Sequence, residues 1–312
     1  MKKYVIGADV GGTAVKLGFF TTEGELLEKW EIPTDTSLGG NILKDITESC
    51  ISKMKDLNLN KDEFAGIGIG VPGPVTSEGV VDNCVNLGWG KKYVKKEMQE
   101  LMELPVSVGN DANLAALGEV WRGSARGCND AVMVTLGTGV GGGIIINGRM
   151  VAGSHGYGGE IGHMVMNLHE KEKCNCGKKG CVEQYCSATG IVRETLKALS
   201  GYEGKTLLSG CDPLTAKGIF DAAKAGDAFA LSQVNIFCRR LARACSFISG
   251  VTDPEVFVIG GGVSKAGKII TDKVAGYYDE YSYGEQKKTE FVLAALGNDA
   301  GIYGCARSIL SE

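Results

Sequence analysis

Short apolar runs separated by glycine-rich turns recur along the whole chain. Runs of this kind, rich in Val, Ile, Leu and Phe, are typical of strands in the interior of a sheet. The pattern therefore predicts strands at residues 4–6, 15–20, 66–71, 106–108, 132–136, 144–146 and 256–259.

Longer segments between these runs have the mixed polar and apolar character of helices. The predicted helices are residues 42–57, 94–102, 113–121, 187–199, 213–225 and 228–250. A chain of 312 residues exceeds the size at which one hydrophobic core usually stops growing. We therefore expect two α/β domains, one made of residues 1–117 with 298–312 and a larger one of residues 118–297.

The glycine content is unusual for a chain of this length. The sequence holds 47 glycines, against about 22 at the average usage of roughly 7%. They gather beside the predicted strands, and we expect ordered loops there, in which glycine lets backbone amides approach a ligand or adopt a positive φ. The clusters are GADVGGT at 7–13, GIGIGVPGP at 66–74, GTGVGGG at 137–143, GSHGYGGEIGH at 153–163 and GGGVSKAG at 260–267.

Two of the clusters share one design. Residues 4–20 and 132–146 each read as strand, glycine turn and strand with a threonine in the turn, which predicts an approximate internal duplication. GTGVGG satisfies the GxGxxG pattern, but that pattern binds a dinucleotide only where it opens a helix, and here a strand follows. The chain also lacks the GxxxxGK[ST] pattern. Two interpretations stay open: nests of amides that bind phosphate, and plain packing turns.

Asp9 lies inside the first of these clusters. A carboxylate beside amides that bind phosphate would repel the ligand unless a cation lay between them. Mg²⁺ is typically bound through a carboxylate, waters and substrate phosphates. The sequence therefore predicts a magnesium-bound phosphate at the first hairpin.

Asn110 and Asp111 follow a predicted strand and precede a predicted helix. A carboxylate at a strand end faces the place where ligands collect in α/β folds, and phosphoryl transfer to a hydroxyl needs a group that accepts its proton. Asn or Asp at such a junction is equally a good N-cap. The residues alone do not separate these two interpretations.

Three cysteines stand within eight positions, Cys174, Cys176 and Cys181. They lie too close together to be independent core residues, and clusters of this kind more often bind metal than form disulfides. A tetrahedral structural zinc site needs four protein ligands. Candidates for the fourth are His155, His163, His169 and Cys186; chance clustering and a redox switch are the alternatives.

Composition excludes several classes of protein. The formal net charge of -4 and the balance of 44% hydrophobic with 22% charged residues are those of an ordinary globular protein and offer nothing to nucleic acid. No apolar run reaches the length of about 20 residues that crosses a bilayer, and the first residues do not form a signal-peptide core. We therefore expect a cytoplasmic protein with no membrane partner.

Four motifs in this order resemble the ROK family of bacterial sugar kinases and related repressors. They are DVGGT at 9–13, GTGVGGG at 137–143, ExGH at 160–163 and CxCGxxGCxE at 174–183. The resemblance extends nearly from end to end. It implies the two-domain actin-like ATPase fold, also called hexokinase-like or RNase H-like, with ATP and sugar in the interdomain cleft.

The resemblance also implies roles for individual residues. Asp111 would be the general base, and the sugar would be held by Asn110, Asp111, Glu160, His163 and Glu183; read alone, the two glutamates would be ordinary surface residues. His163 would complete the zinc site with Cys174, Cys176 and Cys181. The ATP and Mg²⁺ side would comprise Asp9, Gly11, Gly12, Thr13, Lys16, Thr138 and Gly139, with Gly260, Gly261 and Gly262 near the adenosine.

The expected activity is transfer of the γ-phosphate of ATP to the 6-hydroxyl of glucose, by a homodimer that also carries a structural Zn²⁺. Kinase activity on N-acetylmannosamine, mannose or fructose is the nearer alternative, with Asn83 and Asn86 on the far side of the sugar. A sugar-responsive transcriptional regulator is the more distant one. Because Asp9 stands so close to the first residue and the net charge is negative, we expect no DNA-binding segment.

Overall fold

The structure, a computed structural model, describes residues 2–37, 40–82 and 84–311, so Asn83 lies outside the described residues. The chain divides into two compact units, which are described separately. Unit 1 comprises residues 1–129, 143–159 and 295–312, and unit 2 comprises residues 130–142 and 160–294. The expected domain boundary at residues 117 and 118 falls inside a helix of unit 1.

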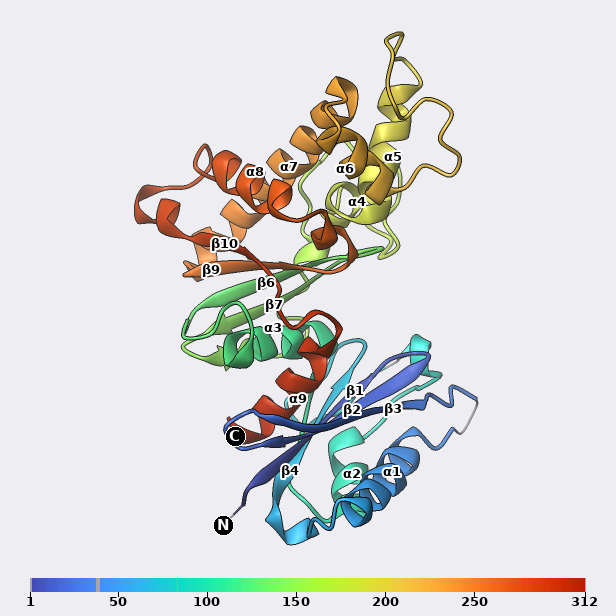
Figure 1. Ribbon diagram of the computed structural model, residues 1–312, viewed down its shortest axis with the longest axis vertical. Coiled ribbons are helices and arrows are strands. Elements are labelled where there is room, and N and C mark those ends of the chain that lie inside the picture. The colour runs from blue at the N-terminus through green and yellow to red at the C-terminus, as the bar shows by residue number, and fades with distance from the viewer. Residues whose placement is uncertain (1, 38–39, 83, 312) are drawn as a thin grey trace. The chain divides into compact units, whose positions relative to one another are not determined.

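Unit 1 is built on a five-stranded sheet with the order β3-β2-β1-β4-β5 (Figure 1). Its central strand, β1, pairs antiparallel with β2 and parallel with β4, which in turn pairs parallel with β5. The carboxyl ends of the three parallel strands therefore meet at one edge of the sheet. The strands are β1 (Tyr4–Val10), β2 (Ala14–Thr21), β3 (Leu26–Pro33), β4 (Phe64–Val71) and β5 (Val106–Asn110).

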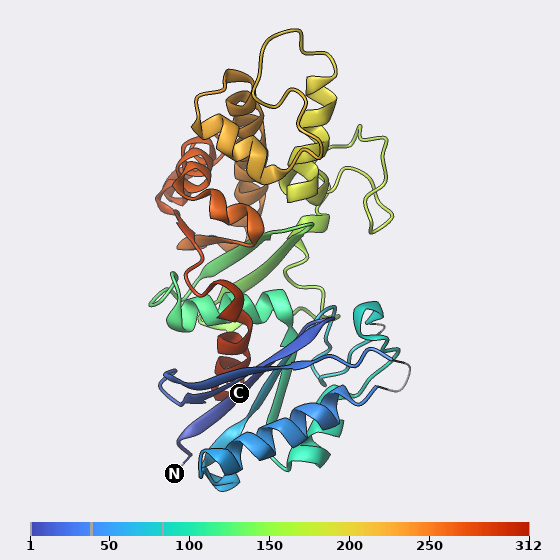
Figure 2. The same ribbon diagram turned by 45° about the vertical axis from the view of Figure 1, so that its right-hand side comes forward.

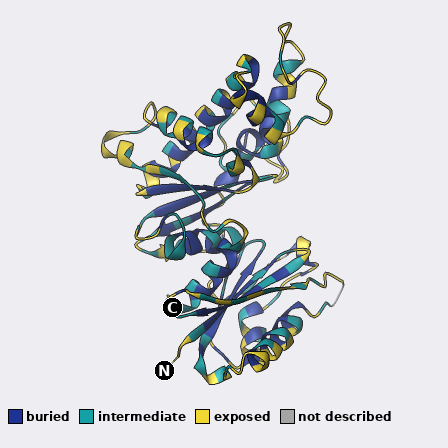
Figure 3. Cartoon of the chain, viewed as in Figure 1, coloured by how far each residue is buried: buried dark blue, intermediate teal, exposed yellow. Residues whose placement is uncertain are grey.

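Helices cover both faces of this sheet, because alternate residues of β1 are apolar on both sides. Ile6 and Ala8 belong to the core that α1 and α2 cover, whereas Val5 packs with Ile302 and Ala306 of α9. Figures 2 and 3 show the helices around a sheet whose central strands are buried. The helices of unit 1 are α1 (Ile42–Asp56), α2 (Val94–Met102), α3 (Asp111–Arg122) and α9 (Ala300–Leu310).

A buried carboxylate fixes the start of the last segment of the chain. Glu119 of α3 is 0% exposed and accepts hydrogen bonds from the amides of Ala295 and Leu296, at 3.1 and 2.8 Å, and from the amide of Ser124 at 2.8 Å. These donors satisfy a charge that would otherwise be costly to bury. The anchor places α9 beside α3.

The second sheet has the order β10-β9-β6-β7-β8. β6 and β10 pair parallel with β9, while β7 runs on from unit 2 into unit 1 and ends in the hairpin with β8. The strands are β6 (Ala131–Leu136), β7 (Val140–Ile146), β8 (Arg149–Met150), β9 (Val256–Gly260) and β10 (Glu290–Leu293). The helices of unit 2 are α4 (Glu183–Cys186), α5 (Ala188–Leu199), α6 (Ala216–Lys224), α7 (Ala228–Thr252) and α8 (Lys268–Tyr278).

Most predicted elements are present, with differences at glycines and at helix ends. The helix predicted from residue 213 begins at Ala216, because the Thr215 side chain caps it by accepting from the amide of Gly218. Of the cluster at 137–143, only residues 137–139 form the turn. Gly143 lies in β7 against α3, where a Cβ atom would come within 2.6 Å of the Ala116 Cβ. The pattern gave no prediction of β3, β10, α4, α8 or α9.

No helix among the described residues is both long enough and apolar enough to span a membrane.

Candidate functional site

The first glycine hairpin joins β1 to β2 through residues 11–13. The amide of Gly11 donates to the carbonyl of Ala14 at 3.0 Å, and the carbonyl of Gly11 accepts from the Thr34 hydroxyl at 2.7 Å. Gly12 and Thr13 are exposed. The end of β3 thus braces the turn while its outer amides stay open to a ligand, as an anion-binding nest requires.

Asp9 stands at the carboxyl end of β1 in a crowded, charged setting. Its partner across the β1–β2 ladder is Lys16, whose ammonium donates to the carbonyl of Asn298 at 2.9 Å. Position 301 in α9 is a glycine, and a Cβ atom there would overlap the Asp9 carboxylate. The pKa of the Asp9 carboxyl is raised to about 6, first by burial and second by the negative charge of Asp111, against the opposing charge of Lys16.

Asn110 and Asp111 occupy the end of β5 and the first turn of α3. The Asn110 side-chain oxygen accepts from the amides of Ala112 and Asn113, at 3.0 and 3.1 Å, so Asn110 is the N-cap. Its amide nitrogen donates to the carbonyl of Gly73 at 3.1 Å. Asp111 accepts from the amide of Ala112 at 2.8 Å. The capping alternative thus applies to Asn110, while the charge of Asp111 acts on Asp9.

The second hairpin joins β6 to β7 through residues 137–139. Its brace comes from the start of α5, because the amide of Ala188 donates to the carbonyl of Gly137 at 2.8 Å and the Thr189 hydroxyl donates to that of Thr138 at 2.7 Å. Thr138 is exposed. This contact between the turn and a helix about fifty residues later could not be read from the sequence.

Glu183 lies directly against the second hairpin. Its Oε2 accepts from the amide of Val140 at 3.1 Å, and its Oε1 lies 3.4 Å from the Cys174 sulfur. A Cβ atom at position 139 would overlap Oε2, so only glycine leaves room for this carboxylate. One side chain therefore connects the turn to the cysteine cluster.

His163, Cys174, Cys176 and Cys181 converge in unit 2, with one candidate ligand atom of each within 4.8 Å of the others. The sulfurs of Cys176 and Cys181 are 3.6 Å apart, and the Cys174 sulfur lies 3.9 Å from Nδ1 of His163. Ligands at about 2.3 Å from a tetrahedral zinc ion would be separated by about 3.8 Å. The donor set and its spacing fit zinc. His155, His169 and Cys186 are not in this group.

The second nitrogen of His163 faces Glu160. Nε2 lies 3.9 Å from a Glu160 carboxylate oxygen, while Nδ1 is on the side of the sulfurs. Glu160 is exposed and the histidine is half-buried. The imidazole therefore has one nitrogen for the cysteine cluster and one turned to an accessible carboxylate.

A cavity of about 360 Å³ lies in unit 2 beside the glycine cluster at 260–267. It is lined by Thr215, by residues of α6 such as Phe220, and by Gly262, Val263, Lys265 and Ala266. Gly262 lines it, whereas Gly260 ends β9 and Gly261 adopts a φ of 80°, and neither lines the cavity. Lys265 and Phe220 offer a cation and a flat apolar surface that sequence reasoning did not single out.

The predicted residues thus form separate groups within the units. Asp9, Lys16, Asn110 and Asp111 lie at one sheet edge of unit 1, and Asn86 adjoins them because its carbonyl would lie 3.5 Å from a Cβ atom at Gly12. Glu183, the second hairpin and the cysteine cluster form the other group, in unit 2. Asn298 and Gly301 were missed, although the glycines of GNDAGIYG were a usable signal.

The chain has two sheets, two similar glycine hairpins and a carboxylate at the first hairpin. These features define the class of two-domain α/β ATPases with the actin-like fold. The sequence pattern of the ROK family matches residues 5–311, and the chain belongs to that family.

Individual relatives agree with this assignment. The chain is 41% identical to a glucokinase of Halalkalibacterium halodurans, over 97% of this chain and 93% of that protein. A ROK hexokinase from Thermus thermophilus superimposes with a TM-score of 0.82 at 28% identity, covering 98% of this chain and 97% of the other. A ROK family glucokinase from Streptomyces griseus, solved with glucose and AMPPNP, gives 0.73 at 31% identity, covering 97% and 98%.

Proposed function

We propose that this protein is a glucokinase, which transfers the γ-phosphoryl group of ATP to the 6-hydroxyl of glucose. The observation that carries the proposal is the carboxylate pair of unit 1, Asp9 and Asp111, set beside a hairpin with open amides. Phosphoryl transfer needs a proton acceptor for the alcohol and a site for the cation that accompanies the phosphates. The identity to glucokinases selects glucose among the alcohols.

Asp111 accepts the proton of the 6-hydroxyl in this proposal. A carboxylate in the first turn of a helix has a fixed direction, and the hydrogen bond that Asp111 accepts from the amide of Ala112 at 2.8 Å holds its carboxylate in place. Asn110 holds the sugar beside it. Because Asn110 caps α3 and is bound to Gly73, its side chain is fixed before the sugar arrives.

Asp9 has the complementary role of holding the Mg²⁺ that accompanies ATP. When bound, the cation supplies positive charge between the carboxylate and the phosphates. The raised pKa of Asp9 fits this role, since the charge of Lys16 does not outweigh desolvation and the negative charge of Asp111, and a cation would supply more positive charge. Gly11, Gly12, Thr13 and Lys16 would hold phosphate oxygens on the first hairpin, and Thr138 and Gly139 on the second.

The cysteine cluster would act as a brace for sugar-binding residues. A structural zinc held by four protein ligands has no open position for a reacting water. Its effect would be to fix the ring of His163, which with Glu160 and Glu183 orients the sugar hydroxyls. The adenosine would occupy the cavity lined by Gly262 and Phe220, with Gly260 and Gly261 shaping its approach.

We also propose that the protein is cytoplasmic, because ATP is its substrate. We propose that it is a homodimer because it resembles the ROK family. Analytical ultracentrifugation would measure the assembly. Sedimentation as a monomer at micromolar concentration would contradict it.

The experiment that tests the function is a comparison of kcat/KM for glucose, mannose, fructose, N-acetylglucosamine and N-acetylmannosamine with ATP and Mg²⁺. Glucose should be preferred. A higher kcat/KM for an acetamido sugar would overturn the choice of glucose as substrate but would leave the proposed phosphoryl transfer unchanged. The absence of phosphorylation of every sugar would overturn the kinase proposal.

A further inference from the structure

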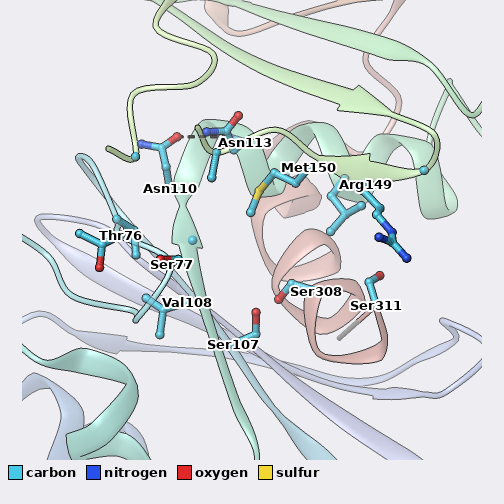
Figure 4. Close-up of a pocket in the computed structure, with 16 residues that line it drawn as sticks. Thr76, Ser77, Ser107, Val108, Asn110, Asn113, Arg149, Met150, Ser308 and Ser311 are labelled. Atoms are coloured by element: carbon cyan, nitrogen blue, oxygen red, sulfur yellow. Dashed lines mark hydrogen bonds between the residues drawn. The ribbon is translucent and has the colours of Figure 1, made fainter. Parts of the chain in front are cut away.

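A second cavity lies wholly within unit 1, beside the edge strand β5 (Figure 4). Its volume of about 360 Å³ is in the range of roughly 300–1,000 Å³ that small-molecule sites occupy. Four parts of the chain line it: residues 75–77, β5 with the first turns of α3, residues 148–156, and the end of α9. Of the described residues that line it, Asn110 is the one that also has a role in the proposed function.

Hydroxyl groups dominate the polar part of the lining. Ser107 of β5 is only 7% exposed and its side chain makes no hydrogen bond to any described residue. Figure 4 shows its oxygen pointing into the cavity, near that of Ser308. Ser308 is 6% exposed and donates to the carbonyl of Cys305 at 2.8 Å, which leaves its lone pairs free to accept. The Ser107 hydroxyl is therefore free to bind a ligand, and the Asn113 side-chain oxygen, from the same lining, is buried without a hydrogen-bond partner among the described residues.

The charge of the lining is positive. Arg149 is the one charged side chain among the described lining residues; it is exposed, and it forms no ion pair with an acidic residue in the described part of the chain. No carboxylate is present among the described lining residues, so the lining has no negative charge to attract a cation. A guanidinium without a partner favours phosphate or carboxylate, which it can bind through two parallel hydrogen bonds.

We propose that this cavity binds a phosphorylated monosaccharide. Arg149 takes the phosphate, the hydroxyls of Ser107 and Ser308 bind sugar hydroxyls, and Val108 and Met150 cover the apolar face of the ring. The choice of glucose 6-phosphate as the occupant rests on the proposed function, because that ester would be the product of the reaction.

A ligand in this cavity would act one residue away from the proposed base. Asn113, 2% exposed, lines the cavity, donates its amide to the Asn110 side chain at 3.1 Å and donates its side chain to the carbonyl of Gly158 at 3.0 Å. Asn110 also lines the cavity and precedes Asp111. We therefore expect the product to inhibit from this site, in addition to any competition with glucose.

The test is calorimetric titration of glucose 6-phosphate into the protein saturated with glucose, which blocks the sugar subsite. We expect one binding event per chain, weakened about tenfold or more in Arg149→Met and in Ser107→Val. Arg126→Met, which removes another exposed arginine of unit 1 outside the cavity, is the matched control and should bind normally. Thermal melts report whether each variant is folded.

Two further titrations separate the parts of the ligand. Glucose alone and inorganic phosphate alone should each bind this site at least about tenfold more weakly than the ester, since each lacks half of the contacts. Equal affinity for phosphate would overturn the sugar part of the proposal. No binding beside saturating glucose, or binding unchanged in both variants, would overturn the site.

Kinetics distinguish this proposal from the proposed function. Initial rates at saturating glucose should fall with added glucose 6-phosphate in the parent protein and in Arg126→Met, but not in Arg149→Met. Inhibition that persists in Arg149→Met would place the product elsewhere. If the protein binds the ester through Arg149 but does not phosphorylate glucose, the proposed binding site is supported and the glucokinase assignment is wrong.

Discussion

The two glycine hairpins follow one plan but acquire their carboxylates in different ways. In unit 1 the acid is Asp9, two residues before the turn and opposite Lys16 in the ladder. In unit 2 the acid is Glu183, which comes from α4 and accepts a hydrogen bond from Val140 just after the turn. Both hairpins are braced by a neighbouring element through a threonine hydroxyl, Thr34 in one case and Thr189 in the other.

This difference indicates a division of labour. The carboxylate of Asp9 is half-buried beside a second acid, and the positive charge of Lys16 does not fully offset these effects, which suits a cation-binding role. The carboxylate of Glu183 is held by a backbone donor and adjoins the cysteine cluster, which suits a fixed hydrogen-bond acceptor. A duplicated backbone motif thus carries two chemistries, because the residues brought against it differ.

The largest effect should come from the base beside the first hairpin. Asp111→Asn removes the proton acceptor and keeps the side chain's size, so kcat should fall by about 10² to 10⁴. Glucose binding, measured by calorimetry, should change little because the sugar contacts stay. Near-normal turnover would contradict the assigned role.

Asp9→Asn should lower kcat about a hundredfold, since cation-assisted charge stabilisation contributes several kcal/mol. The same change should stabilise the fold. The folded pKa of about 6 lies above the ordinary 3.8, so the ionised form costs free energy that grows as pH rises from about 4 to 6. Removing it should raise the free energy of unfolding above pH 6 by up to about 3 kcal/mol.

Denaturant titrations of Asp9→Asn and the parent protein at pH 4 and pH 7, without Mg²⁺ or nucleotide, measure this gain. The difference between the two proteins should be small at pH 4 and large at pH 7. A variant that is less stable than the parent at pH 7 would show that Asp9 is stabilised by its neighbours.

In unit 2, Cys176→Ser should lose the bound zinc and raise the KM for glucose by about 10- to 100-fold, because the brace on His163 is lost. Cys211→Ser is the matched control, since both cysteines are exposed but only Cys176 belongs to the cluster. Metal content by mass spectrometry and glucose kinetics check this. A zinc-free protein with full affinity for glucose would contradict the proposal that zinc supports the sugar-binding residues.

The smallest effect should come from Gly139→Ala, whose new methyl group would displace the Glu183 carboxylate. We expect the KM for glucose to rise by up to about tenfold, or about 1.4 kcal/mol. At Gly137 an added Cβ meets nothing within 4 Å, so Gly137→Ala is the control in the same turn. Equal effects of the two changes would mean that Glu183 does not depend on the space at position 139.

The sequence by itself determined most of the central strands, the two hairpins, the cysteine cluster and the carboxylates at residues 9 and 111, but not the strands β3 and β10. These features are local, since apolar runs, glycine turns and closely spaced thiols each lie within a few consecutive residues. Motif order determined the family. Local spacing alone left the fourth partner of the cysteines open among four candidates.

Only the tertiary structure decided which distant residues complete each group. It brings Gly301 against Asp9, Glu183 against Gly139, and Ser107 beside Ser308 in a cavity of unit 1. It also shows that residues 300–310 form a helix, α9, and which face of the first sheet this helix covers, whereas the sequence assigned residues 298–312 only to the first domain. The physical reason is that packing and hydrogen bonds between segments far apart in the chain depend on where whole helices and strands come to lie, and periodicity within one segment carries no information about its partner.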